Sequence, residues 1–459
     1  MRWSIKNTRS WWKNLFITNK KYSYINSIFP SVLASFLVVC IFLKISYFIT
    51  IPLLIVVCFL NSLNLKFWNL FLFFSVILVI SLLIYQFLFK KYDGQEIEGN
   101  YELIKKYKNK LIFRYKQFNF QVNIKDNKFN LNENLKTNLL FYVSGKMQKL
   151  NEISLFNIRN QIFYNFNYSN LAYIKEIPNS NFIYHSNEIV QDYLNIIVLN
   201  RYSYVSSIYK KLSDLNIIHF FTISGFHFSL IYSFLSFIFK KNKIKKPYNE
   251  LISLMFLLVY LIILGHKISA IRAMLFLLLN FINKNFLKSK FSKISLLAIS
   301  ALTMSLYNPF EFFSYSFILS YIITLLILIT YDLCKKLNIY AKNIIVILVA
   351  HLSSTLIIHT FSDKYNIFSI FIQVLVAPWI SFNFIISILL FKTGFLIEKI
   401  ILMMDSFLNL LNTSNFYWYF KISNEICILL ISWVLIINRI KIFEIFAIPN
   451  IKRYSLINS

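Results

Sequence analysis

Long apolar stretches alternate with short polar segments along most of this chain of 459 residues. A helix needs about 17–25 apolar residues to cross a bilayer. By that measure, three spans are predicted early in the chain, at 27–43, 47–63 and 67–89. A second group is predicted at 218–239, 250–265, 268–283, 294–307, 312–331, 343–361, 367–391, 395–411 and 425–438. The pattern predicts a polytopic α-helical membrane protein with about twelve transmembrane helices.

A polar interval of about 110 residues separates the two groups of spans. Residues 111–124 alternate apolar and polar side chains at the period of a strand, and residues 138–146 have the pattern of a strand that ends in a turn. We therefore expect a small β-rich, OB-like domain over 91–200, outside the cytoplasm. Its aromatics could stack on bases. The alternative is that alternating aromatics simply form the core, which we favour by roughly three to one. These aromatics are Phe118, Phe120, Phe141, Tyr142, Phe163 and Tyr164.

The segment before the second group of spans has helical periodicity. Over 201–217, apolar side chains recur at helical spacing, with Lys210, Lys211 and Asp214 on the other side. This pattern predicts an amphipathic helix at the membrane interface. The remaining predicted divisions are a basic tail (1–26), a three-helix membrane segment (27–90), a transmembrane domain (218–438) and a second tail (439–459).

Composition agrees with a membrane protein, since 57% of the residues are hydrophobic and the mean hydropathy is +0.58. The net charge of +29 suggests a nucleic-acid partner, but Lys, Asn, Ile, Phe and Tyr are over-used everywhere, as an AT-rich coding bias would produce. The position of the charge is more informative. Counting Lys and Arg, one side of the predicted topology holds 25 and the short loops of the other side hold 4. This asymmetry predicts a multi-pass protein of the cytoplasmic (inner) membrane with both termini in the cytoplasm.

Motifs for hydrolytic chemistry are missing from the sequence. It has no GxxxxGK[ST] phosphate loop, no HExxH and no GxSxG, and its six histidines are widely dispersed. The first 26 residues carry six basic residues without a small-residue cleavage site, so we expect a cytoplasmic tail and no signal peptide. The four cysteines lack metal-ligand spacing. We therefore predict no enzymatic activity, no metal and no cofactor, which favours a conduit.

The segment HFFTISGFH opens an apolar run with polar residues that a lipid-facing helix would not need. His219 and His227 would share one broad face of a continuous helix. A break at Gly225, with Ser224 satisfying freed backbone groups, would instead turn His227 into a cavity. The alternative is an interfacial His219 and a His227 that is satisfied in the core.

A second polar segment, GHKISAIRA, places Gly265, Ser269 and Arg272 in the membrane region. An arginine there costs about 2.5–3.5 kcal/mol unless it is paired or reaches the interface. Two interpretations stay open: the side chain extends outward to water, or its planar guanidinium faces a polyanion such as phosphate.

These segments resemble those of the ComEC-type competence DNA-uptake channels. ISGFH is similar to that family's ISGLH signature, and a Ser-Ala-x-Arg-Ala segment after a glycine is matched from Gly265 to Ala273. NPFEFFSYSFILSY (308–321) and NIFSIFIQVLVAPW (366–379) are similar to a third and a fourth family segment. The resemblance covers about residues 200–380, and it implies passage of single-stranded DNA across the cytoplasmic membrane during natural transformation. The candidate path residues are His219, Ser224, Gly225, His227, Gly265, Ser269, Arg272, Phe317, Ser320 and Pro378.

The resemblance also implies partners. These are single-stranded DNA, the lipid bilayer, a surface DNA receptor, a cytoplasmic motor or strand-binding proteins, a separate nuclease and further copies of the chain. Two departures stand out. Many members carry Gly-Asp where this chain has Leu199 and Asn200, and only about 20 residues follow the last predicted span, which resembles the short form without a nuclease domain.

Two alternatives remain. A secondary transporter or flippase for an anionic solute or lipid would use similar broken helices. Ion coupling would require a buried Asp or Glu, and the core spans offer almost none. A purely structural or assembly role would predict that Arg272 and His227 tolerate alanine.

Overall fold

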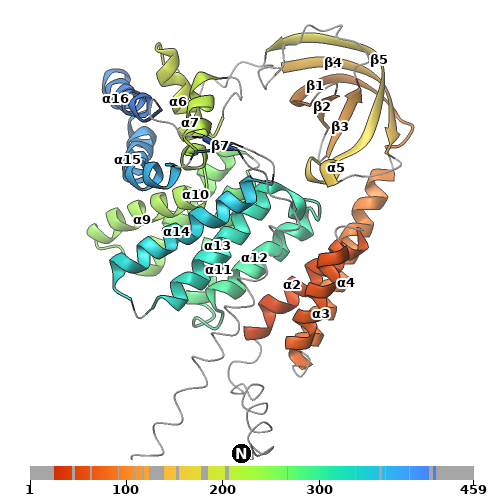
Figure 1. The fold of residues 1–459 in the computed structure, drawn as a ribbon, viewed down its shortest axis with the longest axis horizontal. Coiled ribbons are helices and arrows are strands. Elements are labelled where there is room, and N and C mark those ends of the chain that lie inside the picture. The colour runs from red at the N-terminus through yellow and green to blue at the C-terminus, as the bar shows by residue number, and fades with distance from the viewer. Residues whose placement is uncertain are drawn as a thin grey trace, which may run out of the picture.

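The computed structural model describes residues 25–43, 47–61, 65–90, 92–107, 110–115, 118–123, 139–150, 155–176, 185–201, 206–265, 267–335, 337–360, 364–366, 368–391, 393–412 and 417–419. The span predicted at 425–438, the tail at 439–459 and nearly all of the tail at 1–26 lie outside these residues. A body of helices carries a small β-barrel at one end (Figure 1).

Within the part of the chain that the structure describes, helices occupy the predicted apolar segments. The first group contains α2 (Ile25–Phe42), α3 (Tyr47–Leu60) and α4 (Leu65–Lys90). The second group contains α8 (Ile218–Phe221), α9 (Gly225–Lys241), α10 (Lys246–Leu264), α11 (Ile268–Asn285), α12 (Lys293–Tyr307), the 3-10 turn η1 (Glu311–Phe313), α13 (Tyr315–Leu333), α14 (Ile339–Ile358), α15 (Ser369–Leu390) and α16 (Gly394–Asn412).

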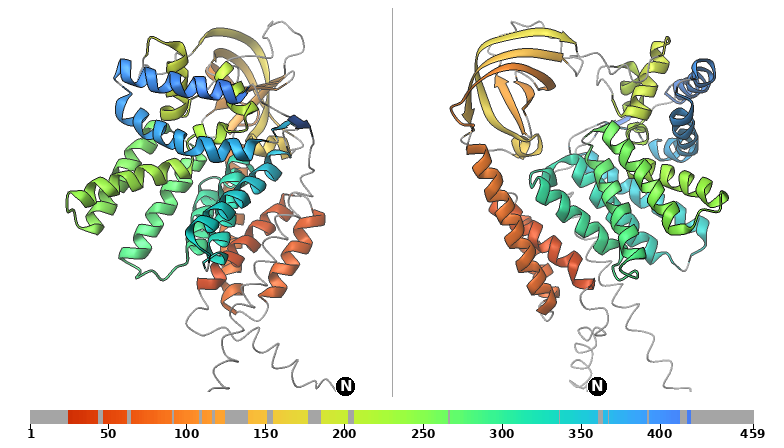
Figure 2. Two further views of the ribbon diagram at one scale, coloured as in Figure 1. Left: turned by 60° about the vertical axis from the view of Figure 1, so that its left-hand side comes forward. Right: turned by 180° about the vertical axis from the view of Figure 1, so that it is seen from behind.

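Among the described residues, six helical segments are long and apolar enough to cross a membrane: α4, α8 with α9, α10, α13, α14 and α15. Helices α2, α3 and α12 are apolar but shorter. α11 carries Arg272 and Lys284. α16 carries Glu398, Lys399 and Asp405, and it lies level with the barrel (Figures 1 and 2). The structure therefore supports a polytopic helical protein with six such segments, and the number twelve stays a prediction.

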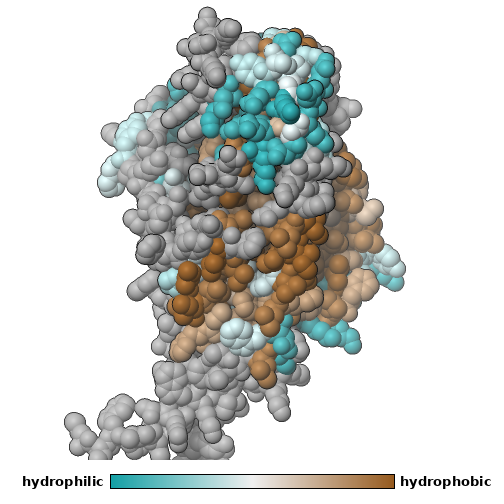
Figure 3. Space-filling view, turned by 90° about the vertical axis from the view of Figure 1, so that its right-hand side faces the viewer, coloured by the Kyte–Doolittle hydropathy of each residue, from teal (hydrophilic) through white to brown (hydrophobic). Residues whose placement is uncertain are grey.

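The outer face of the helices is apolar where a bilayer would contact it. Phe73 on α4 is 58% exposed and Ile262 on α10 is 72% exposed. Figure 3 shows the contrast between the hydrophilic barrel and the hydrophobic surface beneath it. Exposed side chains of this kind are stable in hydrocarbon and costly in water, so this belt is the surface expected of a membrane protein.

The β-rich domain is a closed five-stranded barrel with the strand order β1-β2-β3-β5-β4. Its strands are β1 (Glu96–Tyr107), β2 (Lys110–Tyr115), β3 (Phe118–Asn123), β4 (Leu139–Lys149) and β5 (Ile162–Glu176), with the short helix α5 (Leu155–Arg159) before β5. β3 and β5 run parallel, and the other pairs are antiparallel. Closure leaves no unpaired sheet edge.

Two details of the predicted strands are wrong. The stretch 111–124 is not one strand but most of the antiparallel pair of β2 and β3. The turn predicted at the end of 138–146 is absent, since β4 continues through Gly145 to Lys149. At Gly145 the register shifts, and a Cβ atom would lie 2.2 Å from the Asn167 carbonyl oxygen. The glycine therefore permits close strand approach and does not mark a turn.

The barrel aromatics form its core. Five of the six predicted aromatics are at most 4% exposed, namely Phe118, Phe120, Phe141, Phe163 and Tyr164. Only Tyr142 is half-buried, with its hydroxyl hydrogen-bonded to the Glu98 carboxylate. The core interpretation is therefore confirmed for those five, and they cannot stack on bases.

The barrel sits directly on the helical body through η1. The rings of Phe163 and Phe310 lie 4.7 Å apart, and the Gln161 amide donates to the Glu311 carboxylate at 2.8 Å. Buried side chains of the barrel, α2, α12 and α13 form one continuous apolar cluster. This docking places the barrel over the start of α13.

The segment between the barrel and the second group of helices differs from the prediction. β5 ends at Glu176, and residues 188–199 form a helix, α6 (Glu188–Leu199), which packs against α15 and α16. The amphipathic helix expected over 201–217 is the shorter α7 (Ser207–Asp214), capped by Ser206. Lys211, expected on its solvent face, is largely buried.

Candidate functional site

The segment HFFTISGFH is broken into two helices. α8 ends at Phe221, residues Thr222 and Ser224 are extended, and α9 begins at Gly225. The Ser224 backbone N–H donates to Nδ1 of His227 at 3.2 Å, and the Ser224 hydroxyl lies 3.2 Å from the same nitrogen. The expectation of a helix break is confirmed, and it falls just before Gly225. The His227 side chain, in the first turn of α9, therefore accepts from the Ser224 N–H and caps the N-terminus of that helix.

Two side chains hold the backbone of Ile223 in the middle of the break. The Asn200 side-chain oxygen accepts from the Ile223 N–H at 3.2 Å, and the Ser269 hydroxyl donates to the Ile223 carbonyl at 2.9 Å. Asn200 ends α6 in the left-handed conformation, at φ 51°, which asparagine tolerates better than most residues. The break is therefore fixed from α6 on one side and from α11 on the other.

Beside the break, Arg272 joins three helices. Its Nε donates to the Ser320 hydroxyl of α13 at 2.6 Å, and its guanidinium carbon lies 5.9 Å from the Tyr321 ring. A Cβ atom added to Gly225 of α9 would lie only 2.2 Å from Nη2 of Arg272. The absence of a side chain at Gly225 thus makes room for the guanidinium. We call Gly225, Arg272, Ser320 and Tyr321 the arginine contact.

The charge of Arg272 is buried without a counter-charge among the residues that the structure describes. The side chain is 6% exposed, and its described partners are a hydroxyl and an aromatic ring. A buried cation normally pairs with an anion, because isolated burial costs several kcal/mol. The arrangement can therefore accept an anion at the guanidinium, and phosphate matches its donor geometry.

The two histidines do not share a face, because they lie on different helices. His227 is 1% exposed and packs edge-on against Phe384 of α15, with ring centroids 4.4 Å apart. His219 is exposed beside Phe220. This placement agrees with the alternative in which His227 is satisfied in the core.

The structure brings together six of the ten candidate path residues: Ser224, Gly225, His227, Ser269, Arg272 and Ser320. The Phe317 ring packs at a tilt against the ring of Tyr321, with centroids 4.2 Å apart, and so contacts one member of the arginine contact. Gly265 ends α10 at φ +73° with open space around it, and Pro378 is exposed within α15. Among the described residues, no hydrogen bond or ring contact links these two residues or His219 to the arginine contact.

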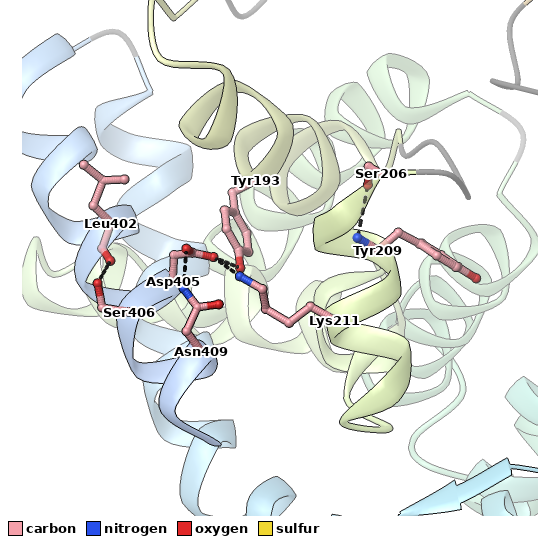
Figure 4. A network of polar contacts seen from close by, with 8 residues as sticks. All are labelled: Tyr193, Ser206, Tyr209, Lys211, Leu402, Asp405, Ser406 and Asn409. Carbon is pink, nitrogen blue, oxygen red and sulfur yellow. Dashed lines mark hydrogen bonds and ion pairs between the residues drawn. The ribbon is translucent and has the colours of Figure 1, made fainter. Parts of the chain in front are cut away.

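A second buried charge was missed in the sequence. Asp405 of α16 accepts from Lys211 at 2.6 Å, from the Tyr193 hydroxyl at 2.7 Å and from the Asn409 amide at 3.0 Å (Figure 4). Burial and, after it, the Asp405 carboxylate raise the pKa of Tyr193, so the hydroxyl keeps its proton and donates it. This cluster fastens α16 to α6 and α7.

Buried carboxylates are thus more frequent than the sequence suggested. Besides Asp405, Glu250 of α10 is 5% exposed and pairs with Lys284 at 2.9 Å, and Glu311 of η1 is 4% exposed and bonded to Gln161. Each has a described partner. Among the described residues, no three His, Cys, Asp or Glu side chains gather as metal ligands.

Sequence comparison supplies independent information. The family model described as "Competence protein" matches residues 198–444, slightly more than half of the chain. An uncharacterized protein of Mycoplasma genitalium, MG316, is 28% identical over 200 residues, which are 43% of this chain and 51% of that protein. Its Mycoplasma pneumoniae homolog, also uncharacterized, is 30% identical over 89 residues, 19% of this chain and 23% of that protein. This chain thus spans about half of the first relative and less of the second. No solved structure matches.

Proposed function

This chain belongs to the competence protein family, and on that premise we propose that it forms the path by which single-stranded DNA crosses the cytoplasmic membrane. Family membership supports a role in DNA uptake in general. The single-stranded substrate and the channel itself are our proposal. The observation that carries it is the buried guanidinium of Arg272. Among the described residues it contacts a hydroxyl and an aromatic ring, and no carboxylate pairs with it.

Each nucleotide brings a negative charge that hydrocarbon cannot hold, so the path must offer polar or cationic groups. The break at 222–224 supplies such groups inside an otherwise apolar helix bundle, because backbone atoms and hydroxyl groups gather there. Non-helical backbone at membrane depth is stable only when it is buried in protein or lines a cavity. We place the strand beside this break, where Arg272 would contact passing phosphates one after another.

The wider arrangement follows from this proposal. We propose about twelve spans with both termini in the cytoplasm, and a barrel of the OB-like class on the outer side. A surface receptor would deliver the strand, and a cytoplasmic motor or strand-binding proteins would pull it. We propose no catalytic role for the chain, so strand degradation would require a separate nuclease.

The test is uptake of labelled DNA by cells that lack this gene and carry the wild type, Arg272→Gln or Lys290→Gln. Lys290→Gln is the matched control, since this substitution also removes one positive charge, but from an exposed loop. We expect cytoplasmic DNA to fall about 100-fold for Arg272→Gln, because losing one partner of a buried charged contact costs roughly 2–5 kcal/mol. DNA bound at the cell surface and protein levels in the membrane should stay unchanged. Normal uptake by cells without the gene would overturn the proposal.

The alternative of a transporter for an anionic solute or lipid is weaker in this arrangement. Ion coupling needs a carboxylate that can bind and release an ion, whereas Asp405 and Glu250 each pair with a lysine and Glu311 accepts from Gln161 at the contact with the barrel. A transporter would also leave DNA uptake intact when the gene is removed, so the same experiment separates the two functions.

A further inference from the structure

Two cations adjoin the residues that hold the break, and a third lies on the barrel. Arg201 directly follows the residue that ends α6, Lys267 precedes α11, and Arg114 lies on β2 of the barrel. Arg114 and Arg201 are exposed, and Lys267 is half-buried. We call these three residues the entry cluster.

Hydrogen bonds tie residues close to Arg201 and Lys267 to the backbone of Ile223. Asn200, the neighbour of Arg201, accepts from the Ile223 N–H, and Ser269, two residues after Lys267, donates to the Ile223 carbonyl. The end of α6 is also tied to α10, because the Tyr260 hydroxyl donates to the Val198 carbonyl at 2.9 Å. Lys267 therefore lies where α10 ends and α11 begins, and Arg201 follows the end of α6 that is tied to Ile223 and to α10.

The barrel contributes Arg114 and one carboxylate. Leu103 of β1 pairs with Phe113 of β2 in antiparallel register, so Glu102 and Arg114 are neighbours on adjacent strands. Burial lowers the pKa of Lys267, and Arg114 and Arg201 lower it further by repulsion, whereas Glu102 raises it. Arg114 and Arg201 are therefore both near enough to repel the Lys267 ammonium, and Glu102 offsets part of that repulsion.

We propose that Arg114, Arg201 and Lys267 form an entry site for the phosphates of the incoming DNA strand, directly above the break at 222–224. This inference rests on the proposed function and adds the place where the strand passes from the barrel to the helices. Like charges held together destabilise one another, and a polyanion that touches all three relieves the repulsion.

A lipid surface fits the entry cluster less well than DNA. Arg114 belongs to the hydrophilic barrel, and the apolar belt that a bilayer would contact lies beneath the barrel (Figure 3). Arg201 and Lys267 adjoin Asn200 and Ser269, the residues that hold the polar break. A chain of phosphates can reach all three groups in succession.

The test measures binding of a fluorescent oligothymidylate to the full chain in discs of neutral lipid, over a range of salt concentrations. The variants are Arg114→Gln/Arg201→Gln/Lys267→Gln and the control Lys241→Gln/Lys243→Gln/Lys245→Gln, which removes the same charge from the exposed end of α9 and the segment before α10. Each phosphate contact on a single strand contributes about 0.7 to the slope of log affinity against log salt. We expect the first variant to lose about 2 from this slope and the control to keep it.

Other outcomes overturn the inference separately from the proposed function. An unchanged slope in the entry variant, with uptake still lost in Arg272→Gln cells, removes the entry site and leaves the channel. Equal loss in both triple variants means that only net charge matters. If the entry variant keeps the salt slope for DNA but binds more weakly than wild type to vesicles that contain phosphatidylglycerol, the entry cluster binds lipid. Normal uptake in cells without the gene removes the proposed function itself.

Discussion

Arg272 and Lys211 are both cations within the helical body, but their surroundings are opposite. Lys211 is 15% exposed and contacts the Asp405 carboxylate at 2.6 Å, with Tyr193 and Asn409 completing the cluster. Arg272 is more deeply buried and meets only a hydroxyl and an aromatic ring among the described residues. The difference teaches that burial alone does not mark a functional charge. A cation with its own anion stabilises the fold, and a cation without one is available to a ligand.

The largest effect on stability is expected at the paired site. Asp405→Asn leaves Lys211 buried without its anion, and we expect the free energy of unfolding to fall by about 3 kcal/mol. Thermal unfolding in detergent would measure this. Lys211→Met/Asp405→Leu should recover most of the loss, because the charge is then gone. The exposed pair of Asp332 and Lys335 is the control, where Asp332→Asn should have no measurable effect.

The next effect is expected at the glycine of the arginine contact. Gly225→Ala places a methyl group against the guanidinium of Arg272, and overpacking of this kind costs about 1–3 kcal/mol. We also expect DNA uptake to fall about tenfold, since the guanidinium must move. Gly394→Ala is the matched control, because a Cβ atom there meets nothing within 4 Å. Equal uptake in both variants would show that the position of Arg272 does not matter.

A smaller effect is expected at Asn200, which holds the break. Asn200→Ala loses the acceptor for the Ile223 N–H and places alanine in a left-handed conformation, at a cost of roughly 1–2 kcal/mol. Asn200→Asp keeps an oxygen that accepts from the Ile223 N–H, and a carboxylate accepts at least as strongly as an amide, so uptake should stay within about twofold of wild type. If Asn200→Asp fails as badly as Asn200→Ala, the hydrogen bond to Ile223 is not what matters.

The smallest change in stability is expected for Arg272→Gln. Because an isolated buried charge is removed, the free energy of unfolding should stay within about 1 kcal/mol of wild type or rise. The same variant is expected to lose uptake, so stability and function should separate. A stability loss as large as that of Asp405→Asn would instead class Arg272 as a structural residue and break the comparison.

Much of the arginine contact could be predicted from the sequence because its signal is local. Polar residues in the apolar runs at 219–227 and 265–273 are costly at membrane depth, so Ser224, Gly225 and Arg272 stood out. The helix break and the β-rich domain followed from similar local patterns. Ser320 was found through a motif resemblance and not through its chemistry.

The missed features depend on contacts between distant residues. Asp405 and Lys211 are 194 positions apart, and Asn200 and Ile223 are 23 apart. Periodicity cannot report such pairs, so Lys211 was assigned to a solvent face and Asn200 was noted only as a departure from the family pattern. The helix at 188–199 was missed because its partners, α15 and α16, come almost two hundred residues later. Gly145 was assigned to a turn because the close approach of β5 is invisible in the sequence.

The continuous apolar cluster under the barrel has a consequence for cooperativity. Ile158 and Phe163 of the barrel share that cluster with Phe310 and Phe317 of the helical body. The barrel floor is therefore completed by residues outside the barrel. Two units that share a core lose stability together, so the barrel and α13 should unfold as one cooperative unit in hydrogen exchange. A barrel excised from the chain would expose its floor aromatics to water and tend to aggregate.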